Sequence, residues 1–276
     1  NKRVVYGLLF QATAETLQTI ARDPRHLGVT LGFTTVLHTW GSALTHHPHV
    51  HCIVPGGGLS RDGATWIPSK RGFFLPVRVL SKLFRRLFLK RLQTAYDDGQ
   101  LAFHGRLRAI GNAQAYADYV KPLRQRDWFV YAKRPFAGPR AVLHYLSRYT
   151  HRVAISNRRL ITCDDQGVTF KWKDYRAKPE RRYKTMRLSV DDFIGRFLLH
   201  VLPSGFHRIR HYVWLANPAR RARLRMLRVL LTRDTASESV EPVADNNAAT
   251  YHCPVCGGAM MIIAVARGSL WARAPP

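Results

Sequence analysis

Two pairs of side chains in this sequence could act together on a phosphate. His49 and His51 flank one aliphatic residue, so on a β-strand both imidazoles would point to the same face. Tyr145 and Tyr149 are four residues apart, so on a helix both hydroxyls would share one face. Imidazoles bind divalent ions, and such an ion polarises a phosphate for attack by a tyrosine hydroxyl. The two pairs therefore predict metal-assisted covalent catalysis by tyrosine.

Each pair also has an ordinary structural explanation. Tyr145 and Tyr149 complete an apolar stripe with Val142 and Leu146, which on a helix would face a core. A lone pair of histidines on a strand is more often structural than metal-binding. The catalytic interpretation depends on both pairs occurring together in a very basic chain.

The net charge predicts a polyanionic partner. The 276 residues include 44 Lys and Arg against 17 Asp and Glu, a formal net charge of +27. This excess favours nucleic acid over a membrane surface, and there is no run of about 18 apolar residues to span a bilayer. The four cysteines do not suggest a disulfide framework. We therefore expect a cytoplasmic protein, associated with the bacterial nucleoid through DNA binding.

Local patterns predict the elements that would position these residues. Residues 4–22 suggest a helix that closes before Pro24, and residues 76–97 a basic amphipathic helix. β-Branched and aromatic residues predict a hairpin over residues 32–54, with the histidine pair on its second arm. The tyrosines fall on a helix that begins after Gly138. The irregular alternation predicts an α+β fold, in which a central, mainly antiparallel sheet carries the histidines and helices flank it.

Several shorter elements complete this prediction. Strands are expected at residues 127–133, 153–156, 160–163 and 168–175, and residues 56–72 are expected to form a loop. A helix capped by Ser189 is expected to turn its apolar residues to the core: Phe193, Ile194, Phe197, Leu198 and Val201.

The motifs, in their order along the chain, resemble a known family. His49-Val50-His51 resembles the histidine–hydrophobe–histidine motif of the HUH single-strand endonucleases, and Tyr145-x-x-x-Tyr149 resembles their two-tyrosine motif. The surrounding stretches at residues 38–58, 145–152 and 206–212 resemble rolling-circle transposases of the insertion-sequence ninety-one family. The resemblance covers about residues 1–217.

The resemblance implies a DNA transposase that nicks and rejoins single-stranded DNA at element ends. It implies a 5′-phosphotyrosine intermediate, with Tyr145 as the first nucleophile, Tyr149 for a second cleavage or strand transfer, and Mg²⁺ or Mn²⁺ as the working ion. Transposon ends and target DNA would be the partners. The fold that it implies, an antiparallel sheet with the tyrosine helix beside it, agrees with the α+β prediction.

HUH sites generally add a third polar ligand, for which two histidines compete. His38 lies on the facing arm of the predicted hairpin, within reach of the pair. His47 lies two residues before His49, so on a regular strand its side chain would point to the same face as those of His49 and His51. Pro48, however, interrupts the strand between His47 and His49. We expect His38 to complete the site.

Basic residues near these motifs would bind DNA phosphates. The candidates are Arg148 and Arg152 beside the tyrosines, and His207, Arg208 and Arg210 further along the chain. Cys253 and Cys256 resemble one knuckle of a zinc ribbon and would hold Zn²⁺ only with ligands from elsewhere.

The predicted domain organisation follows from these features. Residues 1–217 form the catalytic domain, 218–233 a basic helix, 234–250 a flexible linker and 251–276 a C-terminal segment. Family members usually carry a cysteine-rich module before the catalytic region, and the chain starts at Asn1, so we expect a truncated N-terminus. Two other functions stay open: a plasmid-type replication initiator or relaxase with the same nicking chemistry, and a non-catalytic DNA-binding fragment.

Overall fold

The computed structural model describes residues 1–70, 72, 74–133, 135–136, 138–150, 154–216, 220–235, 251–252 and 259–260. Within these ranges the side chains of residues 139, 148–150, 233–235, 251–252 and 259–260 are not described. The chain divides into two units, Asn1–Arg233 and Asp234–Pro276. In the second unit, the short strands β9 (Tyr251–His252) and β10 (Ala259–Met260) pair antiparallel.

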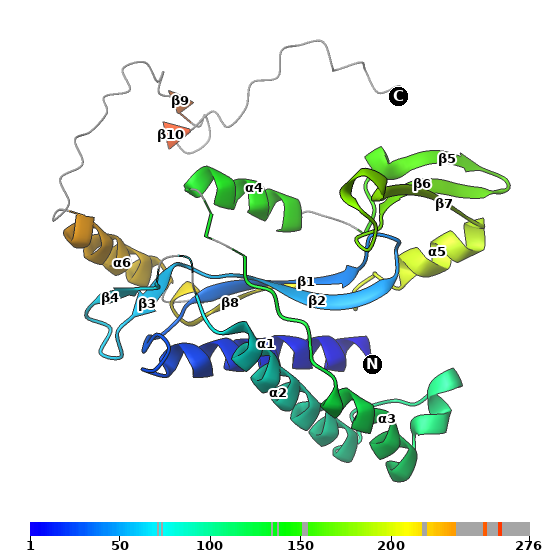
Figure 1. Ribbon diagram of the computed structural model, residues 1–276, viewed down its shortest axis with the longest axis horizontal. Helices are drawn as coiled ribbons and strands as arrows, with labels where there is room; N and C mark the ends of the chain where they lie inside the picture. Colours follow the sequence, from blue (N-terminus) through cyan, green and yellow to red (C-terminus); the bar gives the residue numbers. More distant parts are fainter. Residues whose placement is uncertain are drawn as a thin grey trace. The chain divides into compact units, whose positions relative to one another are not determined.

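The first unit combines helices with antiparallel strands, so the predicted α+β class is confirmed (Figure 1). Its strands are β1 (Phe33–Trp40), β2 (His46–Ile53), β3 (Gly57–Leu59), β4 (Trp66–Pro68), β5 (Leu160–Asp164), β6 (Gly167–Lys173), β7 (Tyr183–Leu188) and β8 (Ile209–Tyr212). Its α-helices are α1 (Lys2–Arg22), α2 (Val77–Asp97), α3 (Ala113–Gln125), α4 (Pro139–Thr150), α5 (Val190–Leu198) and α6 (Arg220–Thr235).

Strands β2, β1 and β8 form a three-stranded antiparallel sheet, here called the histidine sheet. Helix α1 covers one of its faces, where Tyr6 and Phe10 pack against Leu37 of β1, and Val50 of β2 joins them. Because strand side chains alternate between faces, the neighbours of Leu37 and Val50 point to the opposite face. His38, His49 and His51 therefore share the face that α1 leaves uncovered.

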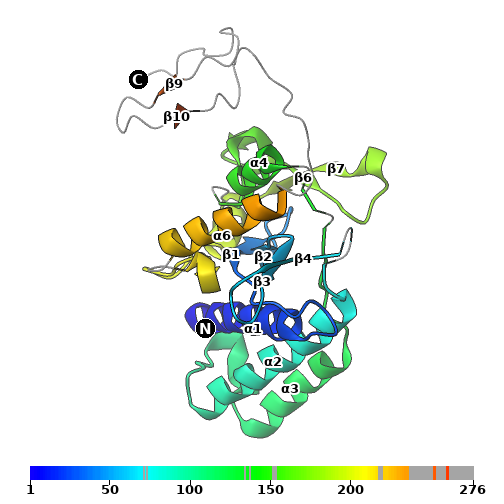
Figure 2. The same cartoon turned by 90° about the vertical axis from the view of Figure 1, so that its left-hand side faces the viewer.

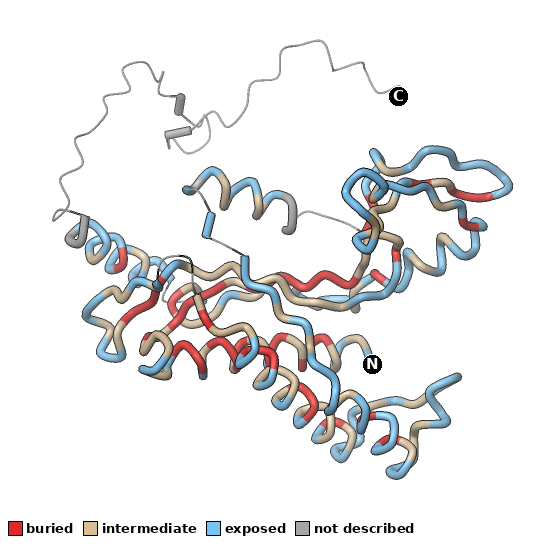
Figure 3. Tube along the Cα trace, viewed as in Figure 1, coloured by how far each residue is buried: buried red, intermediate tan, exposed pale blue. Residues whose placement is uncertain are grey.

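Helices α1, α2 and α3 pack together and supply much of the core (Figures 2 and 3). Phe88 and Leu89 of α2 pack with Leu8 of α1 and with Tyr116 and Val120 of α3. Full burial of such side chains contributes roughly 1.5–3 kcal/mol each. The histidine sheet joins this layer through Phe33 of β1, which shares a core cluster with Leu17 of α1 and Leu80 of α2.

Strands β5, β6 and β7 form a second three-stranded antiparallel sheet, here called the basic sheet. Its inner face carries Phe170, which is fully buried, and Leu188; both pack with Leu44 from the turn between β1 and β2. On the other face, Lys171 pairs with Thr185 and Thr169 with Arg187. The strand predicted at residues 168–175 is thus present as β6, and its basic face is turned to solvent.

Several predicted elements are correct and others are wrong. The hairpin and the helices at residues 4–22, 76–97 and 139–152 form within a few residues of the predicted bounds. Residues 127–133 do not form a strand, because no described strand lies beside them to complete their hydrogen bonds. Residues 56–72 contain the β3–β4 hairpin, in which a Cβ at Gly57 would lie 2.5 Å from the carbonyl oxygen of Ile67.

The helix capped by Ser189 is present, and Phe193 packs on Phe170 as predicted, but most of the other apolar side chains do not face the core. The Ser189 hydroxyl accepts a hydrogen bond from the backbone N–H of Asp192, at 3.1 Å. Ile194, Leu198 and Val201 are nevertheless about half exposed. The sequence pattern identifies the apolar side of this helix, but it does not show whether another element of the fold covers that side.

Among the described residues, no helix is both long and apolar enough to cross a membrane.

Candidate active site

Three imidazoles meet on the uncovered face of the histidine sheet. His38, His49 and His51 each offer a ring nitrogen, and these nitrogens lie within 4.8 Å of one another. The Nε2 atoms of His49 and His51 are 3.1 Å apart. His38 is buried, and its ring stacks on that of Trp40 with centroids 4.5 Å apart.

The hairpin register explains this convergence. His38 is the direct cross-strand partner of His49, while His51 lies opposite Val36 and is thus the diagonal neighbour of His38. Directly opposed Cβ atoms lie about 4.5–5.5 Å apart, within reach for two imidazole rings. His38, His49 and His51 thus occupy adjacent positions of two paired strands.

The tyrosine helix brings a hydroxyl to the same place. The Tyr145 hydroxyl lies 3.2 Å from Nδ1 of His51, although the two residues are 94 positions apart. The Tyr145 ring also lies 5.0 Å from the ring of Phe136, and the Lys133 ammonium 5.8 Å from its centroid. The geometry therefore joins one residue of each chemical pair.

A directed chain of hydrogen bonds links these groups when the imidazoles are neutral. The Nδ1–H of His49 donates to the carbonyl of His47 at 2.7 Å, which leaves Nε2 of His49 as an acceptor. His51 then donates from Nε2 to His49 and accepts the Tyr145 hydroxyl at Nδ1.

Burial keeps these imidazoles neutral. It lowers the pKa of His49 below its usual value. Burial also lowers the pKa of His51, to about 3, with further contributions from the neighbouring His38, His49 and Lys133. Because only neutral imidazole has a lone pair for a metal ion, both side chains are ready to coordinate at neutral pH.

The donor set fits a divalent transition ion. With metal–nitrogen bonds of about 2.1 Å, neighbouring ligand nitrogens lie about 3.0–3.4 Å apart, a range that includes the observed 3.1 Å. The carbonyl that accepts from Nδ1 of His49 is the usual partner of a ligating histidine, since it fixes the ring orientation. Three histidine ligands leave coordination positions open for a phosphate.

The other predicted site residues lie elsewhere or outside the described residues. His47 is exposed; its carbonyl accepts a hydrogen bond from His49 and its ring centroid lies 5.1 Å from that of His49, but the three ring nitrogens that converge are those of His38, His49 and His51. Tyr149 falls within α4, but its side chain and that of Arg148 are not described. Arg152, Cys253 and Cys256 lie outside the described residues.

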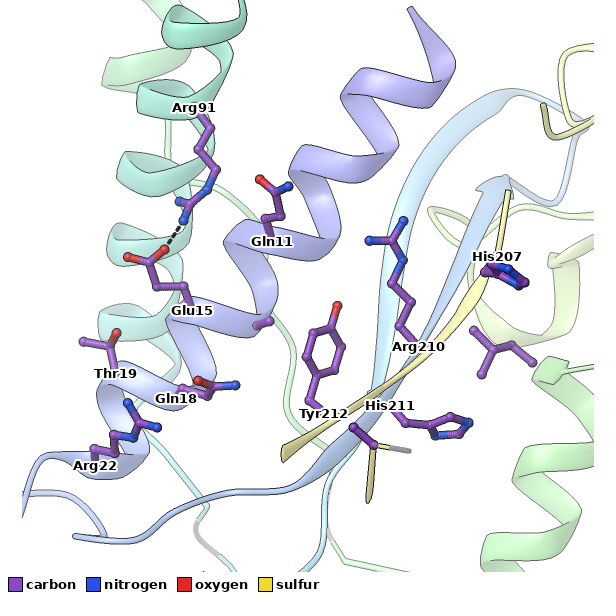
Figure 4. Close-up of a pocket in the computed structure, with 13 residues that line it drawn as sticks. Gln11, Glu15, Gln18, Thr19, Arg22, Arg91, His207, Arg210, His211 and Tyr212 are labelled. Atoms are coloured by element: carbon purple, nitrogen blue, oxygen red, sulfur yellow. Dashed lines mark hydrogen bonds and ion pairs between the residues drawn. The ribbon is translucent and has the colours of Figure 1, made fainter. Parts of the chain in front are cut away.

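Of the predicted phosphate-binding residues only Arg210 belongs to β8, and its side chain lies on the face of the histidine sheet that α1 covers. His207 and Arg210 line a cavity of about 860 Å³ together with residues of α1, including Gln11, Gln18 and Arg22 (Figure 4). The Arg210 guanidinium lies 4.2 Å from the ring centroid of Phe10 on the face covered by α1. The carbonyl of Arg208 accepts the backbone N–H of Leu37. Arg210 and the three imidazoles thus lie on opposite faces of one sheet, while the side chain of His207 points away from that of Arg210 (Figure 4).

Three residues at the site were not predicted from the sequence. Trp40 lies two residues after His38 on β1, so both side chains point to the same face of the strand. This spacing could have predicted their stacking. Lys133 and Phe136 precede the tyrosine helix, but the incorrect strand prediction over residues 127–133 hid their proximity to Tyr145.

Comparison with known proteins gives consistent matches over this chain. The family Y2_Tnp, described as "Putative transposase", matches residues 32–223. "Putative transposase y4qJ" of Sinorhizobium fredii (strain NBRC 101917 / NGR234) is 55% identical over 271 residues, which cover 95% of this chain and 68% of that protein. The "Transposase for insertion sequence element IS801" of Pseudomonas savastanoi pv. phaseolicola is 26% identical over 274 residues, 96% of this chain and 64% of that protein. The chain thus spans about two thirds of the length of these relatives. No solved structure matches significantly.

Proposed function

We propose that this chain, which belongs to the transposase family that matches its residues 32–223, nicks and rejoins single-stranded DNA at element ends by metal-assisted tyrosine attack. The observation that carries the proposal is the Tyr145 hydroxyl, 3.2 Å from His51 and beside a three-histidine cluster. The two named relatives, both transposases, favour element ends over a replication or transfer origin as the DNA that is cut.

The three imidazoles of His38, His49 and His51 would hold the working ion, for which the family resemblance implies Mg²⁺ or Mn²⁺. When bound, the ion supplies Lewis-acid polarisation of the scissile phosphate. Zn²⁺ also suits imidazole ligands and would compete for the site.

His51 is placed to hold a proton on the side of the nucleophile. With Nε2 of His51 as a ligand, the ring proton must reside on Nδ1, which faces the Tyr145 oxygen. In that state this N–H would donate to the Tyr145 oxygen, whereas a neutral His51 that carries its proton on Nε2 accepts from the Tyr145 hydroxyl. A donor at this position stabilises the negative charge that the tyrosine oxygen carries as it attacks.

The proposed cleavage exchanges one ester bond for another. The Tyr145 oxygen bonds to phosphorus and the bond from phosphorus to O3′ breaks. The tyrosine hydroxyl loses a proton, and the departing oxygen gains one as a 3′-OH. The 5′-phosphotyrosine retains the ester bond for rejoining, for which Tyr149 would provide a second nucleophile. Arg148 and Arg152 would contact the DNA backbone beside it.

A covalent-adduct assay tests the mechanism. The chain is incubated with Mn²⁺ and single-stranded DNA that carries an element end, labelled on the 3′ side of the cut, and adducts are resolved by denaturing electrophoresis. We expect a labelled protein band that Tyr145→Phe abolishes and Tyr149→Phe retains in the first cleavage. An undiminished band with both tyrosines replaced would contradict tyrosine chemistry, and efficient cutting of a replication origin would favour an initiator.

A further inference from the structure

Two aromatic side chains before the tyrosine helix lie almost entirely in solvent. Phe129 is 91% exposed, more than any other large hydrophobic side chain among the described residues, and Tyr131 is 70% exposed. Exposure of a phenylalanine ring to this degree opposes the hydrophobic effect, and such exposed aromatics commonly mark binding surfaces.

The backbone that carries these rings is firmly attached. Trp128, just before Phe129, donates its indole N–H to the carbonyl of Leu123 at 3.1 Å and packs on Phe84 and Phe88 of α2. The Ser81 hydroxyl donates to the Trp128 carbonyl, and Val130 packs on the core. In this extended segment Trp128 and Val130 point inward, so Phe129 and Tyr131 must point outward.

The distance between the two rings is close to the distance that a base stacked between them requires. The rings of Phe129 and Tyr131 are nearly parallel, with an interplanar angle of 16° and centroids 6.5 Å apart. Stacked bases are separated by about 3.4 Å, so a base between two aromatic rings requires about 6.8 Å. The two side chains thus form a slot for one unpaired base.

The slot leads directly to the proposed nucleophile. Lys133 follows Tyr131 by two residues, about 7 Å of extended chain, and its ammonium lies 5.8 Å from the centroid of the Tyr145 ring. Arg124 and Arg126, both exposed, precede the slot in the sequence, and the Arg126 carbonyl accepts a hydrogen bond from Arg85, which also pairs with Asp127. Cations before and after the slot in the sequence complement a phosphate backbone that runs along it.

A second pair of exposed aromatics lacks this arrangement. Tyr175 and Tyr183, at one end of the basic sheet, are 71% and 72% exposed. The Lys173 ammonium lies 5.2 Å from one ring centroid and 5.5 Å from the other. Ring faces that already contact an ammonium are less open to a base, so this pair serves as a matched control.

We propose that Phe129 and Tyr131 form a clamp that stacks one base of single-stranded DNA next to the phosphate presented to Tyr145. The inference rests on the proposed function, because it assigns the clamp to the DNA of that reaction. Stacking requires an unpaired base, so the clamp would favour single strands over duplex.

Binding and fluorescence measurements test the clamp independently of cleavage. The probe is a single-stranded oligonucleotide of about 20 residues, end-labelled for anisotropy or carrying 2-aminopurine, whose emission falls when it stacks. Phe129→Ala and Tyr131→Ala should each weaken single-strand binding about ten-fold and restore the emission, while duplex binding stays unchanged. Tyr131→Phe keeps the ring and should behave as the unmodified chain. Tyr175→Ala and Tyr183→Ala should have little effect.

The outcomes separate the clamp from the chemistry. Tyr145→Phe should keep full binding and quenching, so a chain that binds and quenches but forms no adduct would sink the proposed mechanism and leave the clamp standing. Unchanged affinity and emission in Phe129→Ala and Tyr131→Ala would overturn the clamp, and the exposed rings would then suit a protein partner instead. An equal loss in Tyr175→Ala and Tyr183→Ala would also overturn it, because binding would then depend on exposed aromatics in general.

Discussion

The histidine sheet and the basic sheet are both three-stranded and antiparallel, and each has one face packed with apolar side chains. Their other faces differ in chemistry. The histidine sheet carries His38, His49 and His51 there, partly or fully removed from water. The basic sheet exposes Lys171 and Arg187 to solvent, and residues 160–188 contain no histidine.

This difference separates two ways in which a sheet can act on a polyanion. Partly dehydrated imidazoles stay neutral and can coordinate a metal ion, so their function would be lost if their ring nitrogens moved by a few ångströms. Solvated lysines and arginines attract phosphates over about 10 Å at ordinary salt, with little dependence on exact position. The comparison therefore predicts that single substitutions matter greatly on one sheet and little on the other.

The largest contrast is expected in cleavage. His49→Ala should reduce Mn²⁺-dependent nicking by about 10³-fold or more, because a lost ligand removes several kcal/mol of transition-state stabilisation. Single-strand binding should stay nearly unchanged, since phosphates are bound mainly by cations. Gel assays over a Mn²⁺ titration would measure nicking, with Lys171→Ala on the basic sheet as the control. Comparable losses in both variants would remove the distinction between the sheets.

A core substitution tests whether the two sheets are also separate in stability. Phe170→Ala removes a fully buried ring and should lower the free energy of unfolding by about 3–5 kcal/mol. Since Leu44 in the β1–β2 turn packs on that ring's cluster, both sheets should unfold in one transition. Urea denaturation followed by tryptophan fluorescence and far-UV dichroism would show this, and Phe129→Ala offers the same change at an exposed site. Two separate transitions would mean that the basic sheet folds on its own.

The sequence predicts the parts of the site that depend on local pattern. The hairpin at residues 32–54 has β-branched and aromatic residues on its first arm and Val50, Ile53 and Val54 on its second, and its closure places His38 opposite His49. The tyrosine helix could be predicted because Gly138 and Pro139 are typical of a helix start. What brings Tyr145 to His51 is the packing of segments 94 positions apart, and no local pattern encodes it. For the same reason the exposed rings of residues 127–133 were interpreted as part of a strand, although their alternation arises from packing on α2.

Acid should destabilise the histidine sheet first. Burial lowers the pKa of His51 from about 6.5 in the unfolded chain to about 3, so the unfolded state binds its proton at the higher pH. The contribution of His51 to the free energy of unfolding is fully present above pH 6.5. It falls as the pH drops toward 3, by at most about 1.4 kcal/mol per pH unit. Hydrogen exchange should show β1 and β2 losing protection over this range before β6 does. His51→Gln should flatten the dependence, and a profile that it leaves unaltered would assign the acid sensitivity to other groups.

The smallest effect is expected on the basic sheet. Lys171→Ala combined with Lys173→Ala removes two cations from its outer face, and neither takes part in an ion pair among the described residues. If both contact phosphates, the slope of log affinity against log salt for single-stranded DNA should become shallower by about 1.4, since each contact contributes about 0.7. Nicking at saturating DNA should not change, because neither lysine lies at the histidine cluster. Anisotropy titrations at several salt concentrations would measure the slope. An unaltered slope would place the DNA away from this sheet, whereas loss of nicking at saturation would mean that the basic sheet takes part in positioning the scissile phosphate.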